Sequence, residues 1–377
     1  MTPRKLLFLS VSAGAGHVRA AQALHAWGAD AFGGRIESRH LDVMDYVPAS
    51  FRGMYVSGYL KLIQHLPSMW GLLYRATDKT SPDAIPQKLR RAVERLGTRA
   101  LTKAIADFAP DTIISTHFLP AELLAGQTRR GKLDLPLWVL VTDFDLHRMW
   151  VQPHMTGYFA ANDEVKFRLQ AHGIDPARVH VTGIPVMPAF SRPLPRATCA
   201  AEAGLAPDRA TVLLMGGGAG VGHLDTVAAS LLALPRDFQL IVLAGKNRKA
   251  LAALQRLADR HPGRLFPQGF TNQVERLMAC ADVAITKPGG LTTSECLALG
   301  LPMIVHSPIP GQEEHNADYL LEAGVALKAI DETGMEYRLD KLLASPKTLA
   351  AMRARAQSLG RPRAGHDVLR IVLGETT

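Results

Sequence analysis

Cysteine is scarce in this chain of 377 residues, which has only Cys199, Cys280 and Cys296. Their number is odd and no two of them lie close together in the sequence. That pattern argues against a disulfide framework and against the paired spacing of a structural zinc site. We therefore expect a chain that works in a reducing compartment, where thiols stay free.

Long hydrophobic runs are also missing, since no stretch reaches the ~18 apolar residues that a membrane-spanning helix needs. The chain starts with MTPRKLLFLSVSAGAGH, in which a basic end precedes an apolar run, as in a signal peptide. That run is short and leads into glycines and His17 in place of a cleavage site. We interpret it as a buried first strand, and we expect a cytosolic or peripheral membrane protein.

The net charge is +9 and is unevenly distributed. Residues 1–195 contain 23 Lys and Arg against 16 Asp and Glu, a balance of +7, whereas the remainder contains 20 against 18, a balance of +2. Such asymmetry is compatible with an ordinary basic surface. It also predicts an N-terminal half that faces an anionic partner.

Apolar runs typical of buried strands alternate with helical patterns along the whole chain, which is the signature of parallel sheets covered on both faces. A proline-rich stretch at 183–210 interrupts this rhythm and is interpreted as a linker. We expect an α/β protein of two doubly wound domains, residues 1–190 and 191–377, with ligands in the cleft between them. The last helix of the chain is a candidate to pack back on the N-terminal domain. The predicted strands are 6–11, 111–116, 136–143, 158–162, 211–218, 238–245, 282–290 and 302–308.

The first motif is SAGAGH (12–17), at the end of the first predicted strand and the start of a helix. Glycines let the backbone turn sharply, and the helix start offers free amides to an anion. The position three after Gly16 is Arg19, so the dinucleotide fingerprint is not met. His17 on this turn is a candidate for the cleft, although helix capping or packing would also explain it.

The second motif is MGGGAGVG (215–222), again between a strand and a helix. Five glycines in so short a span favour a backbone cradle for phosphate. No Gly-Lys-Ser/Thr follows, so the motif is not a P-loop. A tight structural turn is the alternative.

The third motif is TKPGGLTTSE (286–295). Gly289 and Gly290 free the backbone to approach a diphosphate, and Thr292 offers a hydroxyl or a helix cap. Glu295 lies in the first helical turn, where a carboxylate either accepts hydrogen bonds from a ribose diol or simply complements the helix dipole.

The fourth motif is SPIPGQEEHN (307–316), which opens the next helix. Gln312 and Glu313 are candidates for hydrogen bonds with sugar hydroxyls. Acidic residues in a first helical turn are common for structural reasons, so this motif is modest by itself. Because the last three motifs follow strands of one predicted domain, we expect them to converge on one site.

The chain resembles family 28 glycosyltransferases of the GT-B fold, especially the monogalactosyldiacylglycerol synthases and the processive diacylglycerol glucosyltransferases. The resemblance runs from about residue 5 to 330. It is carried by GAGHVRAAQAL (14–24), TDFDLHRMWV (142–151), VTGIPVMPAF (181–190), GKN (245–247), ITKPGGLTTSE (285–295) and PIPGQEEHNA (308–317).

This resemblance implies a donor UDP-sugar, UDP-glucose or UDP-galactose, bound mainly by the C-terminal domain. It places Phe270 beside the uracil and Glu295 on the ribose. The remaining implied donor contacts are Gly217 and Gly218 with the diphosphate, and Gln312 and Glu313 with the hexose.

The implied reaction is an inverting transfer of hexose to the hydroxyl of diacylglycerol, with His17 as the general base. Asp143-Phe144-Asp145 matches a metal-binding Asp-x-Asp pattern only formally, because it belongs to the TDFDLH motif. We therefore expect no metal and no cofactor. Asp143, together with His147, is expected to orient the acceptor or His17.

An aromatic, basic segment is the candidate for acceptor and membrane contact. Residues 46–75 mix aromatic and aliphatic side chains, as at a headgroup interface, and basic residues follow, which suit anionic membrane lipids. A plain helical hairpin is the alternative. The proposed contacts are Tyr55, Tyr59, Trp70, Tyr74, Arg90 and Arg91, on a peripheral protein at the cytoplasmic face of the membrane.

Two other functions share these features. A UDP-sugar 2-epimerase has the same fold but should need no lipid, and a UDP-sugar sensor would bind without catalysis. Nucleic-acid binding would also explain the basic charge, but the sequence contains no nucleic-acid recognition motif. The choice between glucose and galactose stays open at this level.

Overall fold

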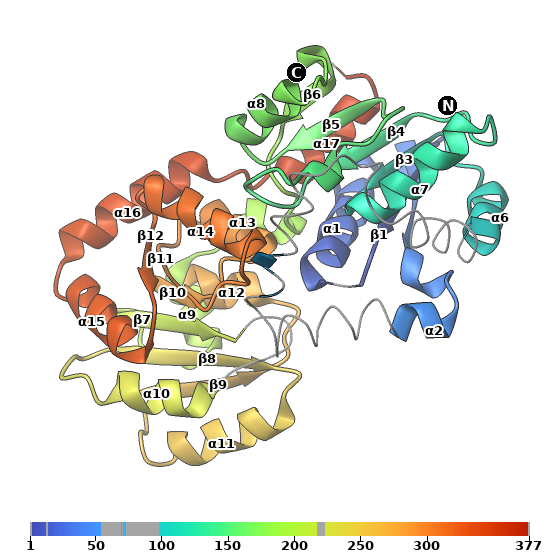
Figure 1. Ribbon diagram of the computed structural model, residues 1–377. Coiled ribbons are helices and arrows are strands. Elements are labelled where there is room, and N and C mark those ends of the chain that lie inside the picture. Colours follow the sequence, from blue (N-terminus) through green and yellow to red (C-terminus); the bar gives the residue numbers. More distant parts are fainter. Residues whose placement is uncertain are drawn as a thin grey trace. The chain divides into compact units, whose positions relative to one another are not determined.

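The computed structural model describes residues 2–12, 14–53, 69, 71–72, 98–216 and 223–375 (Figure 1). The chain divides into two compact units. The first consists of Met1–Pro188, Ile309–His315 and Arg361–Thr377, and the second of Ala189–Pro308 and Asn316–Gly360. Two segments from the last fifth of the chain therefore belong to the N-terminal unit.

The first unit is built on a six-stranded parallel sheet with strand order β2-β1-β3-β4-β5-β6. Its strands are β1 (Arg4–Ser10), β2 (Ile36–Asp42), β3 (Thr112–Ser115), β4 (Leu137–Leu140), β5 (Gly157–Ala160) and β6 (Val179–Val181). Its main helices are α1 (Ala15–Phe32), α2 (Ala49–Arg52), α6 (Thr98–Phe108), α7 (Phe118–Arg129), α8 (Asp163–Ala171) and α17 (Ala364–Val372).

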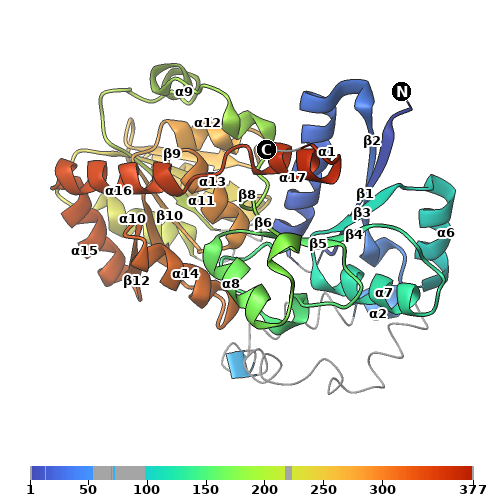
Figure 2. The same cartoon turned by 90° about the horizontal axis from the view of Figure 1, so that it is seen from above.

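Alternation along β1 explains how this sheet is covered on both faces. Leu6 and Phe8 pack into one apolar cluster with α1 and α17. Leu7 and Leu9 point to the opposite face, into a second cluster with α6, α7 and α8. All four side chains are fully buried, as expected for a central parallel strand. Figure 2 shows α17 lying beside α1.

The second unit contains another six-stranded parallel sheet, with order β12-β11-β10-β7-β8-β9. Its strands are β7 (Thr211–Met215), β8 (Gln239–Gly245), β9 (Leu265–Gly269), β10 (Val283–Thr286), β11 (Met303–His306) and β12 (Ala326–Ala329). Its helices are α9 (Arg196–Glu202), α10 (Leu224–Leu232), α11 (Arg248–Ala258), α12 (Val274–Ala279), α13 (Gly290–Ala298), α15 (Glu332–Leu343) and α16 (Pro346–Leu359). Helix α14 (Gln312–Glu322) begins in the first unit and ends in the second.

Right-handed crossovers place the helices of the second unit on both faces of its sheet. The path β7-β8-β9 runs one way across the sheet, and β10-β11-β12 runs the other. Figure 1 accordingly shows α10 and α11 along one side and α12 and α13 on the other. The predicted α/β fold with two doubly wound parallel sheets is confirmed.

The strand order reverses direction once in each sheet, between β1 and β3 in the first and between β7 and β10 in the second. Loops diverge at such switch points, which leaves room for a ligand at the carboxyl ends of the strands. The motif 12–17 follows β1, 215–222 follows β7 and 286–295 follows β10. Three of the four motifs therefore lie at switch points.

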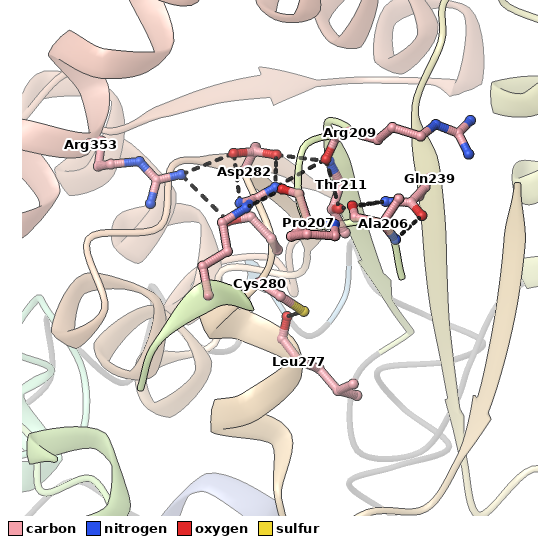
Figure 3. A network of polar contacts seen from close by, with 11 residues as sticks. Ala206, Pro207, Arg209, Thr211, Gln239, Leu277, Cys280, Asp282 and Arg353 are labelled. Atoms are coloured by element: carbon pink, nitrogen blue, oxygen red, sulfur yellow. Dashed lines mark hydrogen bonds and ion pairs between the residues drawn. The ribbon is translucent and has the colours of Figure 1, made fainter. Parts of the chain in front are cut away.

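A polar network holds the opposite, amino end of the second sheet (Figure 3). Asp282 precedes β10, and its carboxylate accepts a hydrogen bond of 2.8 Å from the amide of Thr211 at the start of β7. Arg196 of α9 donates two more hydrogen bonds to it, at 3.0 and 2.9 Å, and Arg353 of α16 another at 3.5 Å. This half-buried carboxylate stabilises the packing of two helices on the sheet, far from the switch point.

Two sequence expectations need correction. The stretch 183–210 is not only a linker, because it contains α9, which Pro195 precedes as N-cap with a φ of −61° that suits proline. The strands β2, β6, β9 and β12 were not predicted, and they are the four edge strands of the two sheets. Edge strands are only partly buried, so they lack the continuous apolar runs that identified the central strands.

Across the described residues, no helix combines the length and the apolar character needed to cross a membrane.

Replacing Gly365 by alanine should destabilise the first unit. A Cβ at this position of α17 would lie 2.3 Å from Cδ1 of the buried Trp27, whose indole Nε1 donates a 2.9 Å hydrogen bond to the carbonyl of Val186. Overpacking against a held ring costs about 1–3 kcal/mol. Urea denaturation should show this loss, whereas Gly34→Ala, with nothing within 4 Å of its Cβ, should change stability by less than about 0.5 kcal/mol.

Candidate active site

The first unit holds His17 on the third residue of α1, at the switch point of its sheet. Its Nδ1 lies 3.1 Å from the carbonyl oxygen of Thr116, directly after β3, and 2.8 Å from the hydroxyl of Thr142, after β4. A carbonyl oxygen only accepts hydrogen bonds, so we assign the ring proton to Nδ1 from its contact with Thr116; the Thr142 hydroxyl can donate or accept and does not discriminate between the tautomers. Nε2 is then left with its lone pair, which is the form of imidazole that takes up a proton.

The surroundings keep this ring neutral. His117 meets His17 edge to face with ring centroids 4.6 Å apart, and the Trp150 ring lies at 6.1 Å. Burial lowers the pKa of His17 to about 4, although its bond to the Thr116 carbonyl favours the charged form. His17 is therefore a neutral base at pH 7.

Two neighbouring histidines have a structural role that the sequence did not reveal. Nδ1 of His117 accepts a 3.0 Å hydrogen bond from the amide of Leu119 and caps α7. Nδ1 of His147 accepts one of 3.1 Å from the amide of Met149, at the start of a short 3-10 helix (Arg148–Trp150). Burial, and then the neighbouring His17, holds the pKa of His117 well below its ordinary value.

Asp143 lies on the same side of the first unit, buried and only 5% exposed. Both of its carboxylate oxygens accept hydrogen bonds of 2.9 Å from Nε2 of Gln312. This contact does not test the predicted roles of Asp143, which are to orient the acceptor or to orient His17. The sequence did not predict the contact between Asp143 and Gln312, since the two residues are 169 positions apart.

Two acidic residues of α14 stabilise the start of this helix by accepting hydrogen bonds from backbone amides that precede it. The carboxylate of Glu313 accepts a 2.7 Å hydrogen bond from the amide of Ile309, and Glu314 accepts one of 2.8 Å from the amide of Gly311. Gln312 and Glu313, which we assigned to the hexose and to the C-terminal domain, thus lie in a segment that packs with the first unit.

In the second unit, the start of α13 presents free backbone amides at the switch point. Gly289 is the N-cap, with no side-chain cap, and the first amides of a helix have no carbonyl partner within it. Thr292 is half-buried in the first turn. The buried hydroxyl of Thr293 finds no hydrogen-bond partner among the described residues. Glu295, which we expected in the first turn, lies one turn further along α13 and is 6% exposed.

Phe270 follows β9 and is 60% exposed, which is unusual for a large aromatic side chain. The ammonium of Lys246, after β8, lies 5.1 Å from the centroid of its ring. The sequence pointed to GKN at 245–247 only through the family resemblance. The structure brings Lys246 and Phe270 together at the carboxyl ends of two neighbouring strands.

The other predicted site residues lie outside the part of the chain that the structure describes. In the predicted membrane segment, the described Met69 and Leu72 are 50% and 66% exposed, respectively. In the described ranges, no group of three or more His, Cys, Asp or Glu is placed to hold a metal ion. The predicted residues outside the description are Gly217, Gly218, Tyr55, Tyr59, Trp70, Tyr74, Arg90 and Arg91.

Lowering the pH from 7 to 5 should reduce the free energy of unfolding. The folded pKa of His17, about 4, lies below its ordinary 6.5, so the unfolded chain binds the proton first. This contribution is fully present above pH 6.5 and is lost as the pH falls toward 4, at a cost on the order of 1 kcal/mol at pH 5. Urea denaturation at both values should show a smaller loss for His17→Gln than for the wild type. Equal losses would contradict a lowered pKa for His17 in the folded protein.

Two family models match the chain: "Monogalactosyldiacylglycerol (MGDG) synthase" over residues 17–186, and "Glycosyltransferase family 28 C-terminal domain" over 211–367. A processive diacylglycerol beta-glucosyltransferase of Bacillus pumilus (strain SAFR-032) is 29% identical over 377 residues, covering 100% of this chain and 96% of that protein.

A chloroplastic monogalactosyldiacylglycerol synthase of Spinacia oleracea is 31% identical, over 93% of this chain and 65% of that protein. The solved UDP-GlcNAc 2-epimerase of Neisseria meningitidis, bound to UDP-GlcNAc, has a TM-score of 0.60 over 98% of this chain and 100% of that chain. At 16% identity it shows the GT-B fold alone. Since both halves match and the relatives align along nearly its whole length, the chain belongs to glycosyltransferase family 28, in the group of the monogalactosyldiacylglycerol synthases and processive diacylglycerol glucosyltransferases.

Proposed function

We propose that this chain transfers a hexose from a UDP-sugar to the hydroxyl of diacylglycerol, with inversion to a β-glycoside. The single observation that carries the chemistry is the tautomer of His17. With the ring proton on Nδ1, His17 donates a hydrogen bond to the Thr116 carbonyl. Nε2 then has a lone pair that can accept the proton of the acceptor hydroxyl. The relatives, named as diacylglycerol glucosyltransferase and monogalactosyldiacylglycerol synthase, support the acceptor.

In the proposed step, the acceptor oxygen attacks the anomeric carbon from the side opposite the diphosphate. The new C–O bond forms as the bond to the diphosphate oxygen breaks, and UDP leaves with the electron pair. The hydroxyl proton passes to Nε2 of His17. A pKa near 4 makes this imidazole a weak base in the free protein, and an arriving dianionic donor favours its charged form.

The start of α13 is the proposed site of the departing diphosphate. Its free amides and the positive end of the helix dipole favour an anion, and Gly289 and Gly290 have no side chains to obstruct its approach. The hydroxyl of Thr292 adds a donor. Gly217 and Gly218 remain predictions from the sequence for the same group. We propose that no metal or cofactor is required, because amides and dipoles stabilise the leaving group.

The rest of the donor follows from the chemistry of the remaining side chains. The carboxylate of Glu295 suits the two hydroxyls of the ribose, because an ionised carboxylate accepts two hydrogen bonds. The exposed ring of Phe270 offers a face on which uracil stacks. Gln312 and Glu313 are the proposed contacts of the hexose.

The acceptor is a lipid, so we propose that the protein works as a peripheral protein at the cytoplasmic face of the membrane. The excess of +7 in residues 1–195 supports attraction to anionic lipids. The exposed Met69 and Leu72 support an apolar contact in the predicted segment. Tyr55, Tyr59, Trp70, Tyr74, Arg90 and Arg91 remain the proposed contacts.

The epimerase is the second candidate, because a solved UDP-GlcNAc 2-epimerase has the same fold. The family matches favour transfer over epimerisation. Incubation with a UDP-sugar alone separates the two, since only an epimerase changes the nucleotide sugar without an acceptor. Diacylglycerol vesicles with radiolabelled UDP-glucose or UDP-galactose then identify the hexose, and the anomeric proton coupling of the product reports inversion.

Replacing His17 by alanine should lower kcat for transfer about 10²–10⁴-fold, because the acceptor hydroxyl then lacks a positioned base. The affinity for UDP should stay nearly unchanged, since His17 is not assigned to the nucleotide. Transfer to diacylglycerol vesicles measures the first quantity and calorimetry with UDP the second.

His25→Ala is the matched control for this change. His25 lies on the same helix, exposed, with its Nδ1 2.8 Å from the hydroxyl of Ser38. Its loss should leave transfer within about twofold of the wild type. Full transfer by His17→Ala, or equal losses in both variants, would remove His17 from the reaction.

Anionic lipid should raise the transfer rate and salt should lower it. Basic residues near an anionic surface each contribute about 1 kcal/mol, and ~1 M salt shortens the Debye length to ~3 Å. The measurement compares diacylglycerol in neutral vesicles and in vesicles with added phosphatidylglycerol, at low and high salt. A short-chain diacylglycerol in neutral detergent is the control, for which salt should matter little. Insensitivity of the vesicle assay to both changes would contradict docking through basic residues.

A further inference from the structure

A second contact lies beside the Asp143–Gln312 pair and uses residues that the proposed reaction leaves unassigned. Nδ1 of His315 lies 2.5 Å from the carboxylate of Asp145. The guanidinium Nε of Arg168 lies 2.9 Å from the other oxygen of that carboxylate. Asp145 is mostly buried, with a side chain 16% exposed, whereas His315 is 41% and Arg168 48% exposed, so a buried carboxylate is held by two partners that reach the surface.

The spacing of these residues makes the two contacts one unit. Gln312 and His315 are three apart at the start of α14 and therefore share a face of the helix. Asp143 and Asp145 are two apart in the segment after β4, so both carboxylates are within reach of that face. We call the His315–Asp145–Arg168 contact the latch.

The position of the helix start fixes the orientation of the Gln312 side-chain amide. Because Nε2 of Gln312 donates to both carboxylate oxygens of Asp143, the amide nitrogen faces Asp143. The amide oxygen is then left as a hydrogen-bond acceptor for a ligand hydroxyl. Any shift of the helix start would release the amide to rotate, and the donor-acceptor pattern offered to a sugar would change.

The helix does not need the latch in order to begin. Glu313 and Glu314 already accept hydrogen bonds from the amides of Ile309 and Gly311. Burial alone would raise the pKa of Asp145, but the hydrogen bond from His315, the Leu146 amide and the charge of Arg168 together lower it. The carboxylate is thus held ionised, ready to accept from His315.

We propose that His315 and Asp145 are positioning residues, which hold Gln312 in the orientation that reads the hexose of the donor. This inference rests on the proposed function for the identity of the ligand. The two residues touch neither nucleotide nor acceptor in this scheme. Their loss should therefore weaken the recognition of the hexose and leave the recognition of UDP intact.

The test compares His315→Leu with His315→Asn by calorimetry, using UDP-glucose, UDP-galactose and UDP as ligands. Leucine removes the donor to Asp145, and the affinity for the preferred UDP-hexose should fall about 10-fold, whereas the affinity for UDP should stay within about twofold. Asparagine places an amide nitrogen near the position of Nδ1, so it should restore most of the lost affinity. Equal losses for UDP and UDP-hexose, or no loss, would overturn the proposal.

A double variant protects the test against general damage to the fold. If His315 acts through Gln312, then His315→Leu should add little to the loss caused by Gln312→Ala alone. Additive losses would show that the latch acts elsewhere and would overturn the proposal. Glu164→Gln, which removes the negative charge of the exposed 2.7 Å partner of Arg168, is the matched control and should change neither affinity.

Binding and turnover separate this inference from the proposed function. If the wild type binds UDP-hexose and the variants behave as expected, but no hexose reaches diacylglycerol, the transfer proposal fails and the latch stands. If the wild type binds UDP-hexose no differently from UDP, the hexose is not read at all, and the latch proposal fails with it.

Discussion

The hydrogen bond from Nδ1 of His17 to the carbonyl of Thr116 is the constraint on which the chemistry of the first unit depends. It joins the start of α1 to the end of β3, across the point where the strand order reverses. The hydroxyl of Thr116 reinforces it, because its single proton is shared between the backbone carbonyls of His17 at 2.9 Å and of Leu9 at 3.2 Å. One threonine thus holds both the backbone and the ring, so that the lone pair of Nε2 has a defined direction.

The two ends of the sheet in the second unit differ in their polar contacts. At the amino end, Asp282 is saturated with donors from Thr211, Arg196 and Arg353, and it stabilises the packing. At the carboxyl end, α13 starts at a glycine N-cap without a side-chain cap. Free amides at this end suit a ligand that arrives and leaves, because an anion there replaces water and not a protein partner. The polar network and the proposed anion site thus lie at opposite ends of the same sheet.

The central part of the fold was predictable, and the edges were not. Strands such as β1 and β7 are buried on both faces and show as apolar runs, whereas β2, β6, β9 and β12 carry polar residues on their open sides. The candidate site divides in the same way. Its glycine turns are local features, but the partners of the functional side chains come from distant positions.

By itself, the sequence determined the alternating α/β architecture, the family and the positions of the glycine turns proposed to bind anions, because each of these depends on residue types within a short window. Only the tertiary structure decided the tautomer of His17, the partner of Asp143 and the membership of 309–315 in the first unit. The reason is physical. A hydrogen bond depends on where two atoms lie, and here they belong to residues 99, 125 and 169 positions apart. No local sequence pattern predicts such a hydrogen bond, because its two atoms come together only when the strands pack side by side.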